Sequence, residues 1–355
     1  MSRVACVRVN PESTDPQVVF GAVKRAMELV DWEKYVAGRT VLLKVNVVWD
    51  KIYPSCTTTP MVIEGVLKTI LGTRHKKLAP KRIIIADTDT AAIVRAEVSF
   101  RVQGIEEMAK KYGVEVVNLS HSEFEVIPFP QGKVLKVLKV SRVLMDADCI
   151  ITMPVLKTHA YSQMTGALKN QWGCIHDMRH NFHTVLSQAI ADVNLFFGDK
   201  IKFAVMDGLF GMEGKGPKTG HPRKVGYVFA SSDLVALDTV AATVMGLGPE
   251  KINHINYAAE AGLGSRKYQL VGDRLPKFQF ARADNANIVM GAEMALRHLG
   301  PKVEKLLFSQ HSPFYHALRW SAKFYYDWWY ERVGIKYASE MMKTNFGRMW
   351  EKRYL

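Results

Sequence analysis

The stretch Ala147-Asp-Cys-Ile-Ile-Thr-Met153 decides the fold class, and Pro154-Val-Leu-Lys-Thr-His159 follows it directly. Apolar residues lie on both faces of this predicted strand, which is typical of a parallel sheet covered by helices on both sides. Polar residues begin where the strand ends. Because ligands of open α/β sheets bind beyond the carboxyl ends of the strands, Lys157, Thr158 and His159 are candidates for a binding site.

Similar short apolar runs alternate with helical patterns along most of the chain. Strands are predicted at 4–9, 40–48, 82–86, 114–118, 147–153, 201–206, 226–230 and 268–271. Helices are predicted at 15–36, 60–71, 100–112, 183–196, 233–245 and 249–261. The stretch 126–142 alternates more strictly and is predicted to form an antiparallel ribbon. The pattern as a whole predicts an α/β body over residues 1–300 with largely parallel sheets and flanking helices, in two lobes with a candidate junction at 145–160.

Composition limits the class of protein. Of the 355 residues, 48% are hydrophobic and 23% charged, which is typical of a globular protein with a large core. The formal net charge of +14 favours anionic partners. The four cysteines are far apart and form no C-x-x-C pair, so neither a zinc ribbon nor an iron–sulfur cluster is expected. The start lacks the apolar core of a signal peptide, and no run is long enough to span a bilayer, so a cytoplasmic protein is expected.

Residues 301–355 are predicted to be a basic, aromatic helical segment. They contain 14 of the 36 aromatic residues of the chain, and 10 Lys/Arg against 5 Asp/Glu. Such a mixture suits the headgroup layer of an anionic membrane, which would make the protein membrane-peripheral. It equally suits a helical pair packed on the α/β body, or a homo-oligomer interface. Nucleic acid is not an expected partner, because the basic residues form no dense run.

A second polar cluster follows the first. Thr165-Gly-Ala-Leu-Lys-Asn170 resembles a helix start, where free N–H groups and a lysine can bind an anion. Further along, His176, His180 and His183 would share one face of a continuous helix. His180 and His183 could hold a divalent transition metal, act as a general acid and base, or simply face solvent.

Three other predicted strands also end in polar residues. Lys44 and Asn46 precede a Thr57-Thr-Thr-Pro60 helix start, and Asp87 follows the strand at 82–86. Asp207 precedes a glycine-rich stretch that includes Glu213, and both acids are candidates for general base or cation binding. That stretch contains neither a Walker A nor a G-x-G-x-x-G motif, so no nucleotide site is predicted.

Polar clusters at several strand ends predict a cleft. Its candidate substrate-binding residues are Lys44, Asn46, Thr57, Thr58, Thr59, Asp87, Lys157, Thr158, Thr165, Gly166, Lys169, Asn170, Gly214, Lys215 and Gly216. Its candidate catalytic residues are His159, His180, His183, Asp207 and Glu213.

The polar clusters also carry a family resemblance. The strings LKVNVV, CTTTP, IIIADTDT, DADCIITMPVLKTH, MTGALKNQWGC, VMDGLFGMEGKGPKTG, ASSDLVALDTVAATVMGLGP and AAEAGLGS, within residues 40–272, resemble the domain of unknown function 362 family. This resemblance implies no particular reaction. Many relatives carry ferredoxin-like cysteine motifs and are described as iron–sulfur proteins, but this chain lacks those cysteines.

A looser resemblance concerns KTHAYSQMTGALKN and the histidines after it. This segment resembles the nickel-pincer segment of lactate racemase, in which a lysine anchors the cofactor and a later histidine binds nickel. The resemblance places Lys169 at the cofactor lysine and His180 or His183 near the nickel ligand. The family's S-G-G-R-K is T-G-A-L-K here, and the Pro-Gly that follows is absent. The resemblance therefore implies a shared fold and not a shared cofactor.

These observations predict an enzyme that binds a small carboxylate- or phosphate-bearing substrate and carries out isomerase- or redox-type chemistry. The alternative is a non-catalytic protein that binds a membrane surface or a protein partner through residues 301–355.

Overall fold

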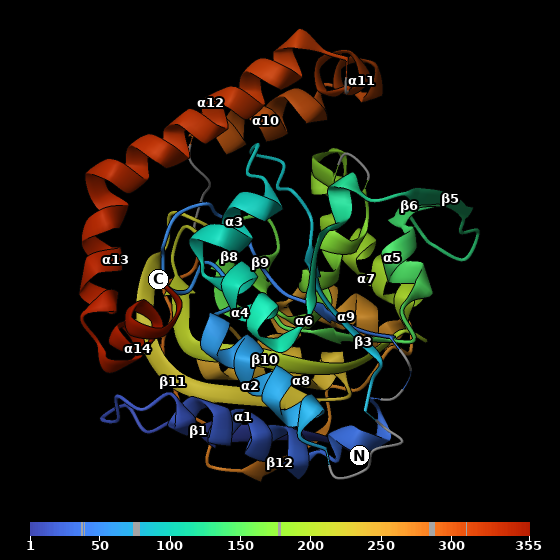
Figure 1. The fold of residues 1–355 in the computed structure, drawn as a ribbon. Coiled ribbons are helices and arrows are strands. Elements are labelled where there is room, and N and C mark those ends of the chain that lie inside the picture. Colours follow the sequence, from blue (N-terminus) through green and yellow to red (C-terminus); the bar gives the residue numbers. More distant parts are fainter. Residues whose placement is uncertain (37, 39, 74–78, 177–178, 284–287, 310) are drawn as a thin grey trace.

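The computed structural model describes residues 1–36, 38, 40–73, 79–176, 179–283, 288–309 and 311–355 (Figure 1). Its main strands are β1 (Ser2–Arg8), β2 (Thr40–Lys44), β3 (Arg82–Asp87), β4 (Glu115–Asn118), β7 (Cys149–Thr152), β8 (Val155–His159), β9 (Gln163–Thr165), β10 (Ile201–Glu213), β11 (His221–Ser231) and β12 (Tyr268–Gly272). They form one ten-stranded sheet in the order β12-β1-β11-β10-β7-β2-β3-β4, and β8 joins β9 to β10. The strands on both sides of residues 145–160 therefore belong to the same sheet.

Strands β4, β3, β2, β7 and β10 run parallel, so their carboxyl ends lie at one edge of the sheet. Helices cover both faces, namely α1 (Gln17–Leu29), α2 (Pro60–Leu71), α3 (Ala96–Val102), α4 (Ile105–Tyr112), α5 (Arg142–Asp146), α6 (Ala167–Asn170), α7 (Leu186–Phe197), α8 (Leu234–Met245) and α9 (Asn253–Glu260). Neighbouring strand residues face opposite cores, as the pleat requires. Leu42 packs in the core that contains α7 and α8, and Leu43 in the core that contains α1 and α2. The predicted α/β class is confirmed.

The antiparallel ribbon is also found as predicted, with β5 (Phe124–Pro128) paired to β6 (Val137–Ser141). Two other expectations need correction. The strand predicted at 201–206 continues to Glu213, because β11 pairs with it antiparallel as far as the pair Glu213 and His221. The helix predicted at 100–112 is divided by Gly104, whose φ of 74° lies in the left-handed region that favours glycine.

The C-terminal residues form the predicted helical segment. Its helices are α10 (Ile288–His298), α11 (Pro301–Phe308), α12 (Pro313–Trp329), α13 (Ile335–Met342) and α14 (Asn345–Tyr354), with a π-turn at Tyr330–Gly334. Figure 1 shows α10, α11 and α12 as an arm beside the body, with α13 and α14 returning to it. Trp350 and Phe346 of α14 are fully buried in the core that contains α2 and α4. No helix in the described ranges is long and apolar enough to cross a membrane.

Candidate functional site

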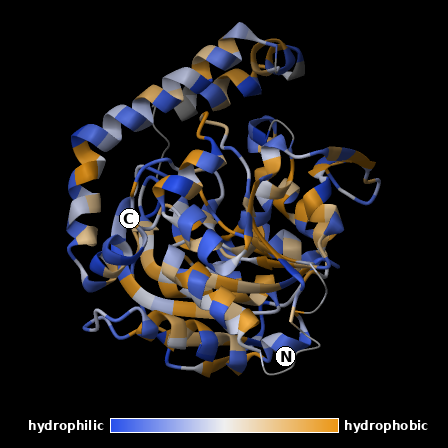
Figure 2. Ribbon diagram, in the orientation of Figure 1, coloured by the Kyte–Doolittle hydropathy of each residue, from blue (hydrophilic) through white to orange (hydrophobic). Residues whose placement is uncertain are grey.

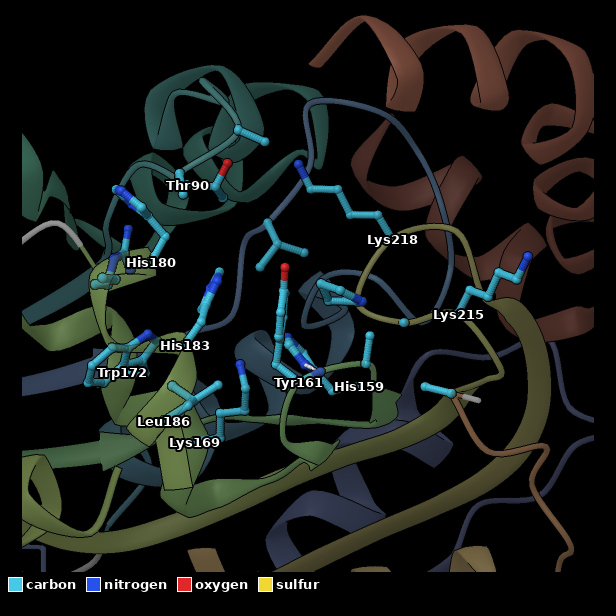
Figure 3. A pocket seen from close by; sticks show the side chains of 18 of the residues that line it. Thr90, His159, Tyr161, Lys169, Trp172, His180, His183, Leu186, Lys215 and Lys218 are labelled. Atoms are coloured by element: carbon cyan, nitrogen blue, oxygen red, sulfur yellow. Dashed lines mark hydrogen bonds between the residues drawn. The ribbon is translucent and has the colours of Figure 1, made fainter. Parts of the chain in front are cut away.

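Three adjoining cavities lie beyond the carboxyl ends of the parallel strands. The inner cavity, of about 110 Å³, is lined by residues that include Lys44, Asn46, Asp87, Lys157, His159, Thr165, Lys169, Asn170 and Arg179. The outer cavity, of about 250 Å³, adds residues that include Tyr161, His180, His183, Lys215, Gly216 and Lys218. The side chamber, of about 160 Å³, lies between His180, His183 and α12. Figure 3 shows side chains that line such a cavity, with His159, Tyr161, Lys169 and His183 close to one another.

The hairpin of β8 and β9 brings Lys157 and His159 to the site. Because strand side chains alternate, Lys157 and His159 share a face that lines the inner cavity, and Thr158 points the other way. The Thr158 hydroxyl lies 2.9 Å from the carbonyl oxygen of Gly214, to which it donates a hydrogen bond. Thr158 therefore ties the glycine-rich loop to the hairpin and lies outside the cavity lining.

Lys157 is fully buried and has only neutral hydrogen-bond acceptors. Its Nζ donates to Asn46 Oδ1 at 2.7 Å and to the carbonyl oxygen of Cys56 at 2.9 Å. Asn46 also donates from Nδ2 to Asn170 Oδ1, so Asn170 orients the amide group that accepts from Lys157. Burial lowers the pKa of Lys157 to about 8. A bound anion would supply a negative counter-charge to this ammonium group.

Lys169 is half-buried and lies near Lys157 and Arg179. Burial and these two cations lower the pKa of Lys169 to about 7. Arg179 donates to Thr88 Oγ1 and to the carbonyl oxygen of Asp89, and burial lowers its pKa. In the described part of the chain, none of these three cations forms an ion pair with a carboxylate.

Lys44 and Asp87 both line the inner cavity, but they neutralise each other. Lys44 Nζ lies 2.6 Å from Asp87 Oδ1, and the exposed fractions of the two side chains are 1% and 6%. The second oxygen of Asp87 accepts a hydrogen bond from the backbone N–H of Val47. This pair joins the ends of β2 and β3, and it leaves the other cations of the cavity uncompensated.

His159 is neutral in this environment. Burial and the neighbouring Lys169 and Lys157 hold its pKa well below the usual value. Its Nδ1 accepts hydrogen bonds from the backbone N–H groups of Tyr161, at 3.1 Å, and Ser162. Because Nδ1 accepts from both N–H groups, the neutral ring carries its proton on Nε2. His159 is suited to donate a hydrogen bond to a ligand oxygen.

His183 is oriented by a carboxylate. Its Nδ1 lies 3.1 Å from Glu293 Oε1, and its ring stacks on Tyr161 with centroids 4.0 Å apart. The other oxygen of Glu293 accepts from the Tyr161 hydroxyl at 2.8 Å. Since a carboxylate only accepts, Nδ1 of His183 carries a proton and Nε2 is left to exchange one with a ligand.

The three histidines near residue 180 do not share the face of one helix, because the chain forms a 3₁₀ turn over Arg179–Val185. His176 instead stacks on Phe124. His180 lies near His183, with ring centroids 6.3 Å apart, and its Nδ1 is 3.0 Å from the Tyr315 hydroxyl. Two Nε2 atoms are thus available, but the described residues contain no group of three His, Cys, Asp or Glu placed to hold a metal. We therefore derive no step through a metal.

The helix start at Gly166 has a different role from the one predicted. Asp238 of α8 accepts from the N–H groups of Ala167, at 2.6 Å, and Leu168, at 2.9 Å. A Cβ atom on Gly166 would lie 2.2 Å from an Asp238 oxygen, so glycine is needed there for space. The protein's own carboxylate occupies the N-terminus of α6, and Thr165, Lys169 and Asn170 of this segment line the inner cavity.

The two predicted acids lie outside the cavity linings. Asp207 is buried within β10, where it accepts from the N–H groups of Thr59 and Leu209. Burial raises its pKa to about 6. Glu213 forms an ion pair with Arg223 at 2.9 Å and accepts from the N–H of Ala281. The structure therefore gives both acids structural partners and brings neither to the site.

Some of the remaining candidate residues line the cavities, and others stabilise the structure around them. Thr165, whose buried hydroxyl has no hydrogen-bond partner, lines the inner cavity, and Lys215 and Gly216 line the outer one. Thr58 donates to the carbonyl oxygen of Met153 and holds the strand ends together. The buried residues Thr57 and Thr59, together with Gly214, are absent from the described linings.

Sequence reasoning missed several residues of the site. Lys218 is buried, its Nζ has no hydrogen-bond partner, and it lies over the ring of Tyr326 at 5.0 Å. Its position in Gly-Pro-Lys218-Thr-Gly was a signal that could have found it. Glu293, Tyr315 and Tyr326 had no such signal, because α10 and α12 reach the cavities only through tertiary packing.

The fold and the cavities define an α/β protein with a cation-rich site at the carboxyl edge of its sheet. The chain belongs to the domain of unknown function family DUF362, whose model matches residues 41–243. The predicted family membership is confirmed. A thylakoid-associated protein of Synechocystis sp. is 37% identical over 136 residues, which cover 36% of this chain and 41% of that protein. The match thus spans less than half the length of the curated relative.

Two solved structures are similar at low identity. One is a Thermotoga maritima protein with 14% identity and a TM-score of 0.37, covering 73% of this chain and 61% of that one. The other is the lactate racemase apoprotein of Thermoanaerobacterium thermosaccharolyticum, with 12% identity and a TM-score of 0.32, covering 73% and 56%. The looser resemblance named this same protein class. Likeness at these TM-scores supports no conclusion about cofactor or reaction.

Proposed function

We propose that this chain is an enzyme that binds a small carboxylate- or phosphate-bearing substrate in the inner and outer cavities and moves a proton on it. The observation that carries this proposal is the charge of the lining. Lys157, Lys169, Arg179 and Lys218 face the cavities without an ion-pair partner in the described residues, and the one described carboxylate in these two linings, Asp87, is bound to Lys44. Burying several unpaired cations is costly for folding, and an anionic ligand offsets that cost.

Two histidines support proton transfer. His183 has a free Nε2 and a carboxylate at Nδ1, which is the usual arrangement of an oriented general base. His159 carries its proton on Nε2 and can stabilise negative charge that develops on a substrate oxygen. Lys169, with a pKa near 7, can give or take a second proton. This set favours isomerase-type chemistry next to a carboxylate over the redox alternative.

The side chamber suggests that the substrate also has an apolar part. Its lining combines Tyr161, Tyr315, Tyr325 and Tyr326 with small and apolar residues such as Ala91, Ala92, Leu318 and Ala322. Tyr161, His180, His183 and Tyr326 also line the outer cavity, so a ligand can reach both spaces. An anionic group near Lys169 with a short apolar or aromatic tail would fit this arrangement.

The test is solvent exchange. A panel of carboxylates and phosphate-bearing metabolites is incubated with the protein in D₂O, and deuterium uptake is followed by NMR. We expect uptake into at least one compound with wild-type protein and with the control Lys267→Met, which changes an exposed lysine outside the cavity linings. Lys169→Met should lose binding, and His183→Gln should bind but not exchange. Exchange that persists in both Lys169→Met and His183→Gln would contradict the proposal.

A further inference from the structure

The outward side of α12 carries an aromatic stripe. Trp320, Phe324 and Trp328 are spaced four residues apart, so they lie along one face of the helix. Their exposed fractions are 62%, 74% and 49%. Ile335, at the start of α13, lies seven residues after Trp328 and is 49% exposed. We call these four residues the outer stripe, and none of them packs on the body of the protein.

The opposite side of the same helix packs against the body of the protein. Tyr326, Trp329 and Tyr330 pack against Trp49 and Tyr53 of the body, with Trp49 and Tyr330 centroids 5.3 Å apart. The aromatic residues of the segment therefore divide into two sets. The inner set explains how the helix is attached, and it gives no reason for three large aromatic side chains on the outer side.

Basic residues flank the outer stripe. Arg332 and Lys336, on the π-turn and α13, are exposed and have no carboxylate partner among the described residues. Lys302 and Lys305 of α11 are likewise exposed, next to Leu306, which is 73% exposed. Of the acids nearby, Asp327 is paired with Lys323 and Glu304 with Arg297, while Glu331 and Glu340 are exposed. Figure 2 shows hydrophilic residues alternating with more hydrophobic ones along the arm.

We propose that the outer stripe docks this protein on an anionic lipid surface. Indole and phenyl rings bury their apolar faces at the headgroup boundary, and the flanking cations bind acidic headgroups. A second copy of the chain is the less complementary occupant, because it would bring the same cations together on a chain that already carries +14. The long side chains of Arg332 and Lys336 can reach headgroups while the rings insert.

Vesicle binding of the full chain tests this directly. The wild type is sedimented with vesicles of phosphatidylcholine alone, or with about one third phosphatidylglycerol, at low and at physiological salt. We expect binding to the anionic vesicles, weakened by salt because the Debye length falls from about 30 Å at 0.01 M to about 8 Å at 0.15 M. The triple variant Trp320→Ser, Phe324→Ser, Trp328→Ser should partition at least tenfold less. The control Val126→Ser, Val137→Ser alters exposed apolar residues of the β5–β6 ribbon, at 63% and 50% exposure, and should bind like wild type.

A second measurement needs no variant. Brominated phosphatidylglycerol should quench part of the tryptophan emission of the wild type, because Trp320 and Trp328 would enter the lipid while Trp49 and Trp350 stay buried in the protein. Three outcomes would overturn the proposal: no binding to anionic vesicles, equal binding by wild type and the triple variant, or a wild-type dimer that the triple variant converts to a monomer without any vesicle binding.

Discussion

The Nδ1 atom of His183 lies 3.1 Å from Oε1 of Glu293, a residue 110 positions further along the chain. Glu293 lies on α10, outside residues 41–243 that match the family model, and it reaches His183 because the C-terminal arm packs over the cavities. The carboxylate also binds Arg297 and Tyr161. Burial raises the pKa of Glu293, but His183, Tyr161 and Arg297 together lower it to about 2. The arm therefore completes a site that begins at the strand ends.

Replacing Glu293 by Gln tests this contribution. Gln can accept through its carbonyl oxygen, but it provides no negative charge to stabilise a protonated His183. We expect proton exchange to fall roughly 10²-fold, within the range for oriented acid–base groups, with substrate binding unchanged. The comparison is Tyr161→Phe, which removes one hydrogen bond to Glu293 and should cost less. Equal activity of Glu293→Gln and wild type would mean that His183 does not depend on this carboxylate.

Lys169→Met separates binding from stability. The variant removes a cation that has no carboxylate partner and fills a similar volume, so we expect a melting temperature equal to or above that of wild type. We expect sulfate, at a concentration too low for its general stabilising effect, to raise the melting temperature of the wild type by binding its folded state and to leave that of the variant unchanged. Differential scanning fluorimetry with and without sulfate measures both. A large loss of intrinsic stability would instead make Lys169 a structural residue.

Anion affinity should fall as pH rises. The ammonium form of Lys169 binds the anion, and its folded-state pKa is lowered from 10.5 to about 7. Binding is therefore strongest below about pH 7 and weakens as the lysine loses its proton, with Lys157 following near 8. Calorimetric titration with sulfate from pH 6 to 9 measures this, because the charge of sulfate is constant there. In Lys169→Met the change near pH 7 should be absent.

Asp87→Asn should destabilise the protein strongly. The substitution leaves Lys44, whose side chain is 1% exposed, without a counter-charge. Breaking one side of a buried ion pair costs about 3–5 kcal/mol. The free energy of unfolding in urea measures the loss. The double variant Lys44→Met, Asp87→Asn should recover part of it, since no buried charge remains, and failure to recover any would show that the contacts of Asp87 with the backbone dominate.

Asp207→Asn should retain substrate binding. Asp207 accepts from two backbone N–H groups within the protein and does not line the cavities, so Asn keeps one acceptor and costs about 1–2 kcal/mol of stability. Because burial raises its pKa to about 6, the folded state binds the proton more tightly than the unfolded state, so the wild type gains stability as pH falls below about 6. The stability difference between wild type and the Asn variant should therefore widen there. A variant that folds but cannot catalyse exchange would show that Asp207 takes part in catalysis.

The sequence by itself determined the α/β class, most strands and helices, and the part of the site that lies at strand ends. Apolar periodicity reports the two faces of each element, and this pattern is local. Lys157 and His159 were predicted because the carboxyl ends of parallel strands meet at one edge of the sheet, and Lys169 was predicted from the helix start that follows them.

The tertiary structure decided which of those polar groups face a ligand. Asp238 lies 72 positions after Gly166 in the chain. Its carboxylate nevertheless accepts a hydrogen bond at the helix start where the sequence predicted a bound anion. Lys44 is neutralised by Asp87, whereas Lys169 has no carboxylate partner within the described part of the chain. Whether a charge is paired depends on atoms from every element packed around it, including α10 and α12 at the far end of the chain. No local pattern carries that information, because burial and pairing are properties of the whole packed fold.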